Sequence, residues 1–435
     1  MNMNDIIIKK RQGGKLTKDE IDYVVSGYVA GDIPDYQVSA LLMAIFFMHM
    51  DEEETSQLTE AMRYSGDTID LSGISGIKVD KHSTGGVGDK TTLVVTPIAA
   101  ACGVPIAKMS GRGLGFTGGT VDKMESIPGF RTSLEPKEFM DQVNDIGISV
   151  IGQTAHITPA DKKLYALRDV TGTVDNFSLI ASSIMSKKLA AGSDKILLDV
   201  KCGDGAFMEN IDDAETLGGI MCDIGNRAGK TTVAAITDMS QPLGKAVGNS
   251  LEVIEAIETL KGNGPEDITE LSKRLGGIML YLGGRAKSAE DGYVIAEHAI
   301  AGGAALEKLK SFIERQGGDS NVVEDYSLFP QPTVELNLIA EESGYIEAIK
   351  AKSIGLASQH TGAGRATKDD EIDLSAGIYL HKKVADHVSK GDVLATFYGR
   401  DKAKVKAARD EAAKAFIITA EKVKKPILIK EILGL

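Results

Sequence analysis

A short loop in the first quarter of the chain gathers residue types that bind anions. The stretch KHSTGGVGDKTT, residues 81–92, holds three glycines within four positions, flanked by lysines, hydroxyl side chains and a histidine. Glycine lets backbone N–H groups approach an anion, and a loop that feeds a helix adds the partial positive charge of its N-terminus. Lys81, Ser83 and Thr92 supply an ammonium and hydroxyl donors, so the loop suits a phosphate. A tight turn without a ligand explains one such cluster equally well.

A second glycine cluster follows at residues 108–130, KMSGRGLGFTGGTVDKMESIPGF. It again places lysine, serine and threonine beside glycines, which favours an anion site built from two loops. Gly113, Gly115 and Gly118 also satisfy the GxGxxG string of dinucleotide-binding proteins. That string normally closes the first strand of a sheet, and here it follows an earlier glycine loop. An NAD-dependent oxidoreductase is therefore a weak alternative.

A hydroxyl and two cations lie on segments predicted to be helical. Ser183 and Lys187, in SLIASSIMSKKLAAG, are four residues apart and so share one helix face. Arg168, near the end of the preceding predicted helix, adds a fork of donors. Together they could grip a polar planar ligand. Spacing alone favours the alternative, in which these cations are solvated or paired with nearby acids such as Asp161.

One histidine has unusual neighbours. Of seven histidines, His82 is the one embedded in a glycine loop, between a lysine and a serine. It is the best candidate for a titrating or proton-donating group. A histidine that only hydrogen-bonds a carbonyl is the rival interpretation.

Composition limits the function classes. A chain of 435 residues, 43% hydrophobic and 26% charged, predicts a globular protein of two or three domains. The net charge of −13 argues against nucleic-acid partners. Three cysteines without CxxC spacing argue against a disulfide framework or a zinc site. No signal peptide and no run of about 18 apolar residues is present, which predicts a cytoplasmic protein without membrane contact.

The elements that must position these residues fall into segments with different patterns. The first segment reads as helices, with capping boxes at Thr17 and Asp51 and a helix in YQVSALLMAIFFMHM that is apolar nearly all round. Such a helix is buried against other helices or in a subunit interface. Two further helices, the first capped by Thr158 with Pro159 in its first turn, are expected to rejoin this set.

Between and after these helices, the alternation of β-rich and helical segments is typical of an α/β domain. TTLVVTPIAAA, VPIAKMS, DKILLDVKC and TTVAAITDMS are predicted as β-rich runs, with a helix around AETLGGIMCDIGNRAG. Pro330 and Pro332 mark a joint, beyond which a mostly β module with one helix runs to the C-terminus. The predicted fold is a helical domain, a larger α/β domain with a central mixed or parallel sheet, and a C-terminal α+β lipoyl-like barrel module. The expected boundaries are 1–66 (helical), 67–157 (α/β), 158–192 (helical), 193–330 (α/β) and 331–435 (C-terminal).

Four motifs together closely resemble the thymidine and pyrimidine-nucleoside phosphorylases, and the likeness extends over essentially the whole chain. They are KVDKHSTGGVGDKTT, AKMSGRGLGFTGGTVDKMESIPGF, IGQTAHITPADKKLYALRDVTGTVD and LIASSIMSKKLA. The resemblance implies phosphorolysis, in which phosphate attacks C1′ of a pyrimidine nucleoside and releases the base and a pentose 1-phosphate. It implies no organic cofactor and a homodimer joined through the helical domain. Because the phosphate loops and the base-binding helices lie on different domains, we expect the domains to close around the substrates.

The resemblance also assigns roles to residues. The phosphate ligands it implies are Lys81, Ser83, Thr92, Lys108, Ser110 and Thr120. The implied base-binding residues are Arg168, Ser183 and Lys187, with Leu114, Ile180, Phe207 and Met208 as apolar walls and Tyr165 nearby. The implied catalytic groups are His82, Arg168 and Lys187. A potassium ion is implied as well, held by backbone oxygens of Gly88, Lys90, Leu243 and Ala246 and by the Glu255 carboxylate.

One departure and one specificity signal stand out. Phe116 occupies the place of a histidine in the family's GLG-His-TGGT string, which leaves His82 to donate to the leaving base, or the electrostatics of Arg168 and Lys187 to stabilise it. Lys108 resembles members that accept both uridine and thymidine, so uridine, thymidine and deoxyuridine are the expected substrates. The alternatives are a thymidine-restricted phosphorylase, a phosphoribosyltransferase of the same superfamily and a lipoyl-type carrier.

Overall fold

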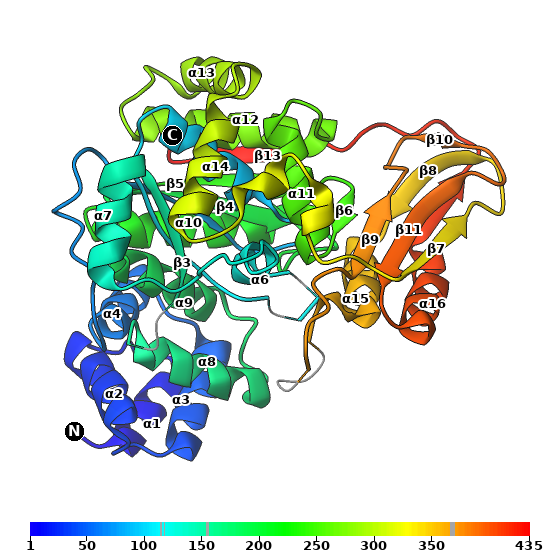
Figure 1. Cartoon of the computed structure of the whole chain (residues 1–435). Helices are drawn as coiled ribbons and strands as arrows, with labels where there is room; N and C mark the ends of the chain where they lie inside the picture. Colours follow the sequence, from blue (N-terminus) through cyan, green and yellow to red (C-terminus); the bar gives the residue numbers. More distant parts are fainter. Residues whose placement is uncertain (114, 117, 154–155, 366–369) are drawn as a thin grey trace.

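The chain forms three regions, of which the α/β body is the central one (Figure 1). This computed structural model describes residues 1–113, 115–116, 118–153, 156–365 and 370–435. The first helices lie to one side of the α/β body, and the C-terminal module lies at the other. Among the residues so described, no helix is both long and apolar enough to cross a membrane.

The helical region combines two parts of the sequence, as predicted. Its first part holds α1 (Met3–Arg11), α2 (Lys18–Ala30), α3 (Asp35–Met48) and α4 (Glu52–Arg63). The capping boxes at Thr17 and Asp51 are confirmed. Its second part holds α8 (Pro159–Thr171) and α9 (Phe177–Ala190). Ala160, Leu164 and Leu179 of these helices pack in one apolar core with the first four.

The predicted cap of α8 is wrong. Thr158 has a left-handed backbone, with φ 47°, and its side chain makes no capping hydrogen bond. Pro159 still opens the helix, where the missing N–H costs nothing. The next helix, α9, does have a side-chain cap: Asn176 accepts a hydrogen bond from the backbone N–H of Leu179 at 3.1 Å.

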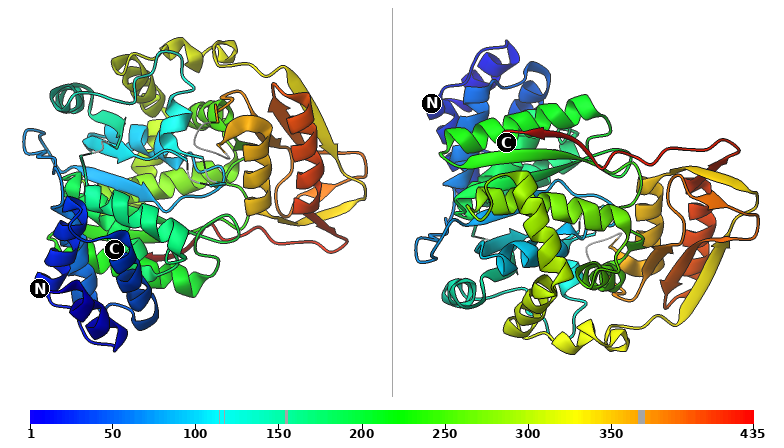
Figure 2. Two further views of the ribbon diagram at one scale, coloured as in Figure 1. Left: turned by 90° about the horizontal axis from the view of Figure 1, so that it is seen from below. Right: turned by 90° about the horizontal axis from the view of Figure 1, so that it is seen from above.

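The central sheet is mixed, in the order β1-β4-β5-β13. The parallel strands are β1 (Val79–Ser83), β4 (Lys195–Cys202) and β5 (Thr231–Asp238). The last strand, β13 (Ile429–Leu433), pairs antiparallel with β5. The sequence prediction placed this closing segment in the C-terminal module. In Figure 2 the chain instead crosses back from that module to the α/β body, where β13 covers what would be an open edge of the sheet.

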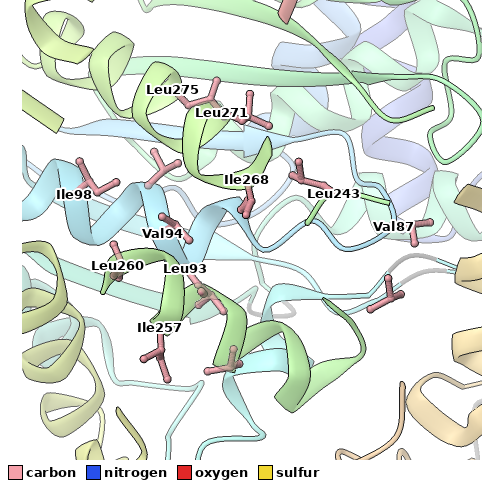
Figure 3. Packing of buried hydrophobic residues seen from close by; sticks show 14 of the residues in the cluster. Val87, Leu93, Val94, Ile98, Leu243, Ile257, Leu260, Ile268, Leu271 and Leu275 are labelled. Atoms are coloured by element: carbon pink, nitrogen blue, oxygen red, sulfur yellow. The ribbon is translucent and has the colours of Figure 1, made fainter. Parts of the chain in front are cut away.

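A buried helix replaces one predicted strand. TTLVVTPIAAA forms α5 (Thr91–Ala101), although its β-branched residues suggested a strand. A continuous apolar run of this length is ambiguous by periodicity, and packing decides it. Leu93, Val94 and Ile98 of α5 lie among side chains of α11 (Asn249–Leu260) and α12 (Glu266–Leu282) (Figure 3).

The remaining elements of the α/β body surround this core. VPIAKMS gives β2 (Ile106–Ser110) as predicted, and it pairs in parallel with β3 (Ile148–Gly152). The other helices are α6 (Thr120–Met124), α7 (Pro136–Ile146), α10 (Ile211–Arg227), α13 (Ala289–Ala301) and α14 (Ala304–Arg315).

In its described residues, the C-terminal module is built mainly from antiparallel strands and two α-helices. Its strands are β7 (Val334–Ile339), β8 (Gly344–Ile349), β9 (Gly377–Leu380), β10 (His387–Val388), β11 (Val393–Gly399) and β12 (Phe416–Thr419). The predicted helix is α16 (Lys402–Ala412), and α15 (Ala351–Ser358) was missed. Strand β6 (Ala246–Val247) of the α/β body pairs with β9, so the module is joined to the body through main-chain hydrogen bonds. The likeness to a lipoyl barrel stays a prediction.

Candidate active site

A cavity of about 720 Å³ opens between the α/β body and the helices α8 and α9. Its α/β wall comes from the carboxyl ends of β1 and β2 and the glycine loops after them, which is where open α/β sheets usually bind ligands. Predicted site residues line both walls: His82, Ser83, Thr92, Lys108, Ser110 and Thr120 from the body, Tyr165, Arg168, Ile180, Ser183 and Lys187 from the helices, and Phe207 from the loop after β4. Segments far apart in the sequence thus meet in one space, as Ser83 and Phe207, which are 124 residues apart, illustrate.

An aspartate organises the first glycine loop. Asp89 accepts a hydrogen bond from the Ser83 hydroxyl and another from the Thr91 hydroxyl, at 2.5 Å for the latter. Burial would raise the pKa of this carboxyl, but Lys201, Lys81 and Lys123 outweigh it and hold the pKa well below its usual value. Asp89 therefore stays ionised and fixes the turn that leads into α5. Asp89 was not among the predicted site residues, although its place between the glycines and a helix start is typical of a capping acid.

Two of the predicted substrate-binding residues that the structure describes, Lys81 and Met208, are not at the cavity wall. The Lys81 ammonium is fully buried behind the loop, 2.9 Å from Asp199 and 2.5 Å from the Thr91 hydroxyl. Met208 is buried beside Cys202 at the end of β4 and is absent from the lining. Leu114 lies outside the described residues. Lys81 is therefore placed to support the loop through Asp199, and its direct contact with phosphate stays a prediction.

Two lysines share one buried acid beneath the cavity floor. The ammonium groups of Lys108 and Lys188 lie 3.3 Å and 2.8 Å from the two oxygens of Asp80. The pKa of Lys108 is lowered to about 7, mainly by burial. The charges of Lys188 and Lys81 also lower this pKa, and the Asp80 carboxylate offsets only part of the shift. Lys188 was missed because it follows Lys187 directly and so points to another side of α9.

The predicted loop histidine, His82, lies instead near the carboxyl end of β1, and it is held neutral. Burial lowers the pKa of His82 well below its ordinary value, and the ammonium groups of Lys188, Lys108 and Lys81 lower it further. A neutral imidazole keeps one N–H, so His82 can donate a hydrogen bond without carrying charge.

The helical wall holds the expected hydroxyl and cations in a specific arrangement. The Lys187 ammonium lies 2.5 Å from Asp161 and 3.1 Å from the Ser183 hydroxyl. The alternative that Lys187 pairs with an acid is thus confirmed, and the pair still faces the cavity. Lys187 and Ser183 act from one helix face, as their spacing predicted.

Arg168 does not pair with an acid in this way. Its guanidinium donates to three backbone carbonyls, those of Thr173 at 3.1 Å, Leu179 at 3.0 Å and Val174 at 2.7 Å. Since a guanidinium has five N–H groups, two are left for a ligand. Arg168 therefore braces the turn between α8 and α9 while lining the cavity.

The residue that departs from the family motif lies elsewhere. Phe116 is partly buried beside the C-terminal module, where the Lys352 ammonium lies 5.8 Å from its ring centre. It lines a small hollow shared with Gly355 of α15, not the large cavity. Its side chain thus belongs to the contact between the α/β body and the C-terminal module.

The five residues expected to hold potassium do come together, but around a side chain of the protein. The Lys90 ammonium lies 2.9 Å from the carbonyl oxygens of both Leu243 and Ala246, and 2.5 Å from the Glu255 carboxylate. The donor set therefore does not fit a bound potassium ion while Lys90 is in this position.

Comparison with known proteins gives a consistent family match. The chain matches the helical bundle domain of a glycosyl transferase family over residues 4–66 and the α/β domain of that family over residues 75–306. Residues 345–419 match the C-terminal domain of pyrimidine nucleoside phosphorylase.

Whole-chain relatives agree with these matches. The chain is 56% identical over 429 residues to the pyrimidine-nucleoside phosphorylase of Geobacillus stearothermophilus, covering 99% of each chain. It is 58% identical over 398 residues to the protein of that name from Bacillus subtilis (strain 168), covering 92% of each. Among solved structures, anthranilate phosphoribosyltransferase from Thermus thermophilus has a TM-score of 0.58 at 18% identity, covering 72% of this chain and 99% of that one, which shows a shared fold.

Proposed function

The chain belongs to the family of pyrimidine-nucleoside phosphorylases, which are pentosyltransferases, and on that premise we propose that it cleaves uridine, thymidine and deoxyuridine with inorganic phosphate in nucleoside salvage. The observation that carries this proposal is the cavity itself, which sets an anion-binding wall of glycine loops opposite a helical wall with a hydroxyl and two cations. The products are the free base and ribose or deoxyribose 1-phosphate.

The phosphate belongs on the α/β wall. Ser83, Ser110 and Thr120 offer hydroxyls, Lys108 offers an ammonium, and Thr92 lies in the first turn of α5, whose N-terminus favours an anion. The glycines at 85 and 86 leave the backbone accessible at the same wall. The expected phosphate is a free nucleophile, held by positioning and charge, with no covalent bond to the enzyme.

The pyrimidine belongs on the helical wall. As a phosphate oxygen bonds to C1′, the bond from C1′ to the base nitrogen breaks and the base departs with the electron pair. Lys187, Ser183 and the two free N–H groups of Arg168 would stabilise the negative charge on the ring oxygens. Ile180 and Phe207 supply apolar surface, and His82, from the opposite wall, would donate its N–H to the leaving base.

We also propose a cytoplasmic homodimer joined through the helical region. The three cysteines of the chain are free, which suits a reducing compartment. One face of α3 leaves apolar side chains exposed in the single chain, which suits contact with a second copy.

The test is release of uracil and thymine from the three nucleosides, with and without phosphate and with magnesium chelated. We expect phosphate-dependent release from all three. Cleavage of thymidine and deoxyuridine without uridine would indicate a thymidine-restricted enzyme. Release that needs a pyrophosphorylated ribose and magnesium would indicate a phosphoribosyltransferase and contradict the proposal.

A matched pair of variants tests the site. Lys187→Met should lower kcat/KM by roughly 100-fold, because it removes a cation aimed at the developing charge. Lys137→Met, on the exposed surface of α7, should leave kcat/KM unchanged. Equal rates for the two variants would remove Lys187 from the mechanism.

A further inference from the structure

A lysine ammonium occupies the centre of an all-oxygen cradle beneath the first glycine loop. The cradle is formed by the carbonyl oxygens of Leu243 and Ala246 and by the Glu255 carboxylate, and Lys90 reaches all three. An ammonium has three N–H donors, so every one of them is satisfied here. Lys90 and Glu255 are 1% and 5% exposed, so this is an interior pair and not a surface contact.

The backbone is shaped closely around that ammonium. Gly88 and Gly244 both have left-handed backbones, with φ of 73° and 69°. A Cβ on Gly88 would lie 2.6 Å from the Leu243 oxygen, and one on Gly244 would lie 2.1 Å from the Glu255 carboxylate and 2.9 Å from the Lys90 nitrogen. Only glycine allows the two loops to approach this closely. The cradle is therefore filled to contact distance by residues of the chain.

The charge around the cradle is already balanced. Glu255 pairs with Lys90, while its neighbour Glu252 pairs with Lys123 at 2.8 Å. The Glu255 carboxylate also accepts the backbone N–H groups of Lys245 and Ala246, at 2.9 Å and 3.1 Å. An added cation would have no unpaired carboxylate to neutralise it and would be repelled by the ammonium beside it.

The ammonium ties the cavity wall to the rest of the α/β body. Lys90 directly follows Asp89 and precedes α5, so it sits at the end of the loop that lines the cavity. Leu243 donates its N–H to the Val87 carbonyl at 3.0 Å, which joins the same two loops a second time. On the far side, the Lys383 ammonium from the C-terminal module reaches the Gly244 carbonyl at 2.6 Å. The position of the glycine loop thus depends on the charge at position 90.

We infer that the Lys90 ammonium takes the place of a monovalent cation in this chain, so that the glycine loop is held without potassium. Lys90 is a positioning residue that acts through the loop and through Glu255. The inference concerns the structure around the loop, and its thermal readout does not depend on the substrates proposed above.

The first experiment uses the wild-type protein. Its melting temperature and its phosphorolysis rate are measured in potassium chloride and in tetramethylammonium chloride at equal ionic strength. We expect both to be the same in the two salts. A saturable rise of either quantity with potassium would overturn the inference.

The second experiment empties the cradle. Lys90→Ser removes the ammonium and leaves a hydroxyl oxygen that can act as a cation ligand. In tetramethylammonium this variant should melt at a lower temperature and lose roughly tenfold in kcat/KM, as for other residues that position a site. Potassium or ammonium ions should restore both quantities saturably, because they fit the vacated space and tetramethylammonium does not.

The control is Lys90→Met, whose uncharged side chain fills the same space. It should show the loss without any rescue by potassium or ammonium. A folded Lys90→Ser variant that no small cation distinguishes from tetramethylammonium would contradict the inference.

Thallium(I) scattering gives a readout independent of activity. Crystals grown with thallium(I) should show an anomalous peak between Leu243, Ala246 and Glu255 in Lys90→Ser, and none there in the wild type. A wild-type peak would overturn the inference even if Lys90→Ser did not fold.

Discussion

At the residue scale, the site depends on buried lysines whose charges are set by their neighbours. Lys81 and Lys201 lie 2.9 Å and 2.8 Å from the Asp199 carboxylate, and Lys108 shares Asp80 with Lys188. Only the last two reach the cavity wall. A lysine beside a glycine loop can therefore either stabilise the loop from the protein interior or face the cavity where a ligand would bind. Which one it does depends on a buried acid that is distant in the sequence: Asp199 is 118 residues from Lys81, and Asp80 is 28 residues from Lys108.

Lys108 is predicted to couple anion binding to pH. Its pKa of about 7 means that it loses its proton near neutrality, while an anion on the α/β wall favours the protonated form. Sulfate is the appropriate probe because it does not titrate in this range. We expect sulfate affinity, measured by calorimetry, to fall as the pH rises above 7, by at most about tenfold per pH unit.

Two variants separate this effect from other titrations. Lys108→Gln should bind sulfate more weakly and lose most of the pH dependence, whereas Lys137→Gln should keep the wild-type slope. The folded pKa of Lys108 lies below the ordinary 10.5, so the unfolded chain binds more protons between about pH 7 and 10.5. Stability should therefore rise with pH across that window in the wild type relative to Lys108→Gln. Parallel sulfate curves for wild type and Lys108→Gln would exclude this coupling.

At the element scale, local signals predicted some elements and tertiary packing decided others. Each capping box, at Thr17 and at Asp51, predicts a helix start from only four residues, and both are present in the structure. The run at 91–101 carries no periodic polar face, so only its burial between α11 and α12 makes it a helix. The last strand was misplaced for a related reason, since its partner β5 lies almost two hundred residues earlier. The local sequence of α5 does not indicate its packing against α11 and α12, and that of β13 does not indicate its pairing with β5.

The exposed face of α3 is predicted to form the subunit contact. Tyr36, Met43 and Phe47 are 73%, 36% and 69% exposed. Their spacing of seven and four residues places them along one stripe of the helix, opposite the buried Leu41 and Ile45. The sequence predicted a helix buried on nearly every side, and in the single chain this stripe is the part left uncovered.

Phe47→Asp should convert a dimer to a monomer in sedimentation velocity. A charge at the centre of an apolar contact should weaken dimerisation by roughly 100-fold or more, as for a buried aromatic anchor. Tyr64→Asp is the control, because Tyr64 is 63% exposed at the end of α4, away from the stripe. An unchanged dimer for Phe47→Asp, or a monomeric wild type, would place the contact elsewhere or remove it.

At the scale of the whole molecule, the cavity lies between two regions that the chain visits alternately. The glycine loops belong to the α/β body, and Arg168, Ser183 and Lys187 belong to the helical region. The sequence predicted both groups and the separate domains that carry them, through glycine loops and helical spacing. It contained no signal for the distance between them, because that distance is set by how the helices pack on the body.

In the proposed function each wall binds one substrate, so we predict that the two regions approach each other only when both substrates are bound. Reaction requires phosphate and C1′ to be held in contact, and such alignment contributes roughly 7 to 11 kcal/mol in favourable cases. Sulfate with uridine gives a pair that occupies both walls without reacting. We expect small-angle scattering to show a smaller radius of gyration with both ligands and the unliganded value with either alone. Lys187→Met should weaken the change, because it loosens the base from the helical wall, while Lys137→Met should preserve it. If the scattering curves are identical without ligand, with sulfate, with uridine and with both, the regions do not approach each other on binding and the prediction is wrong.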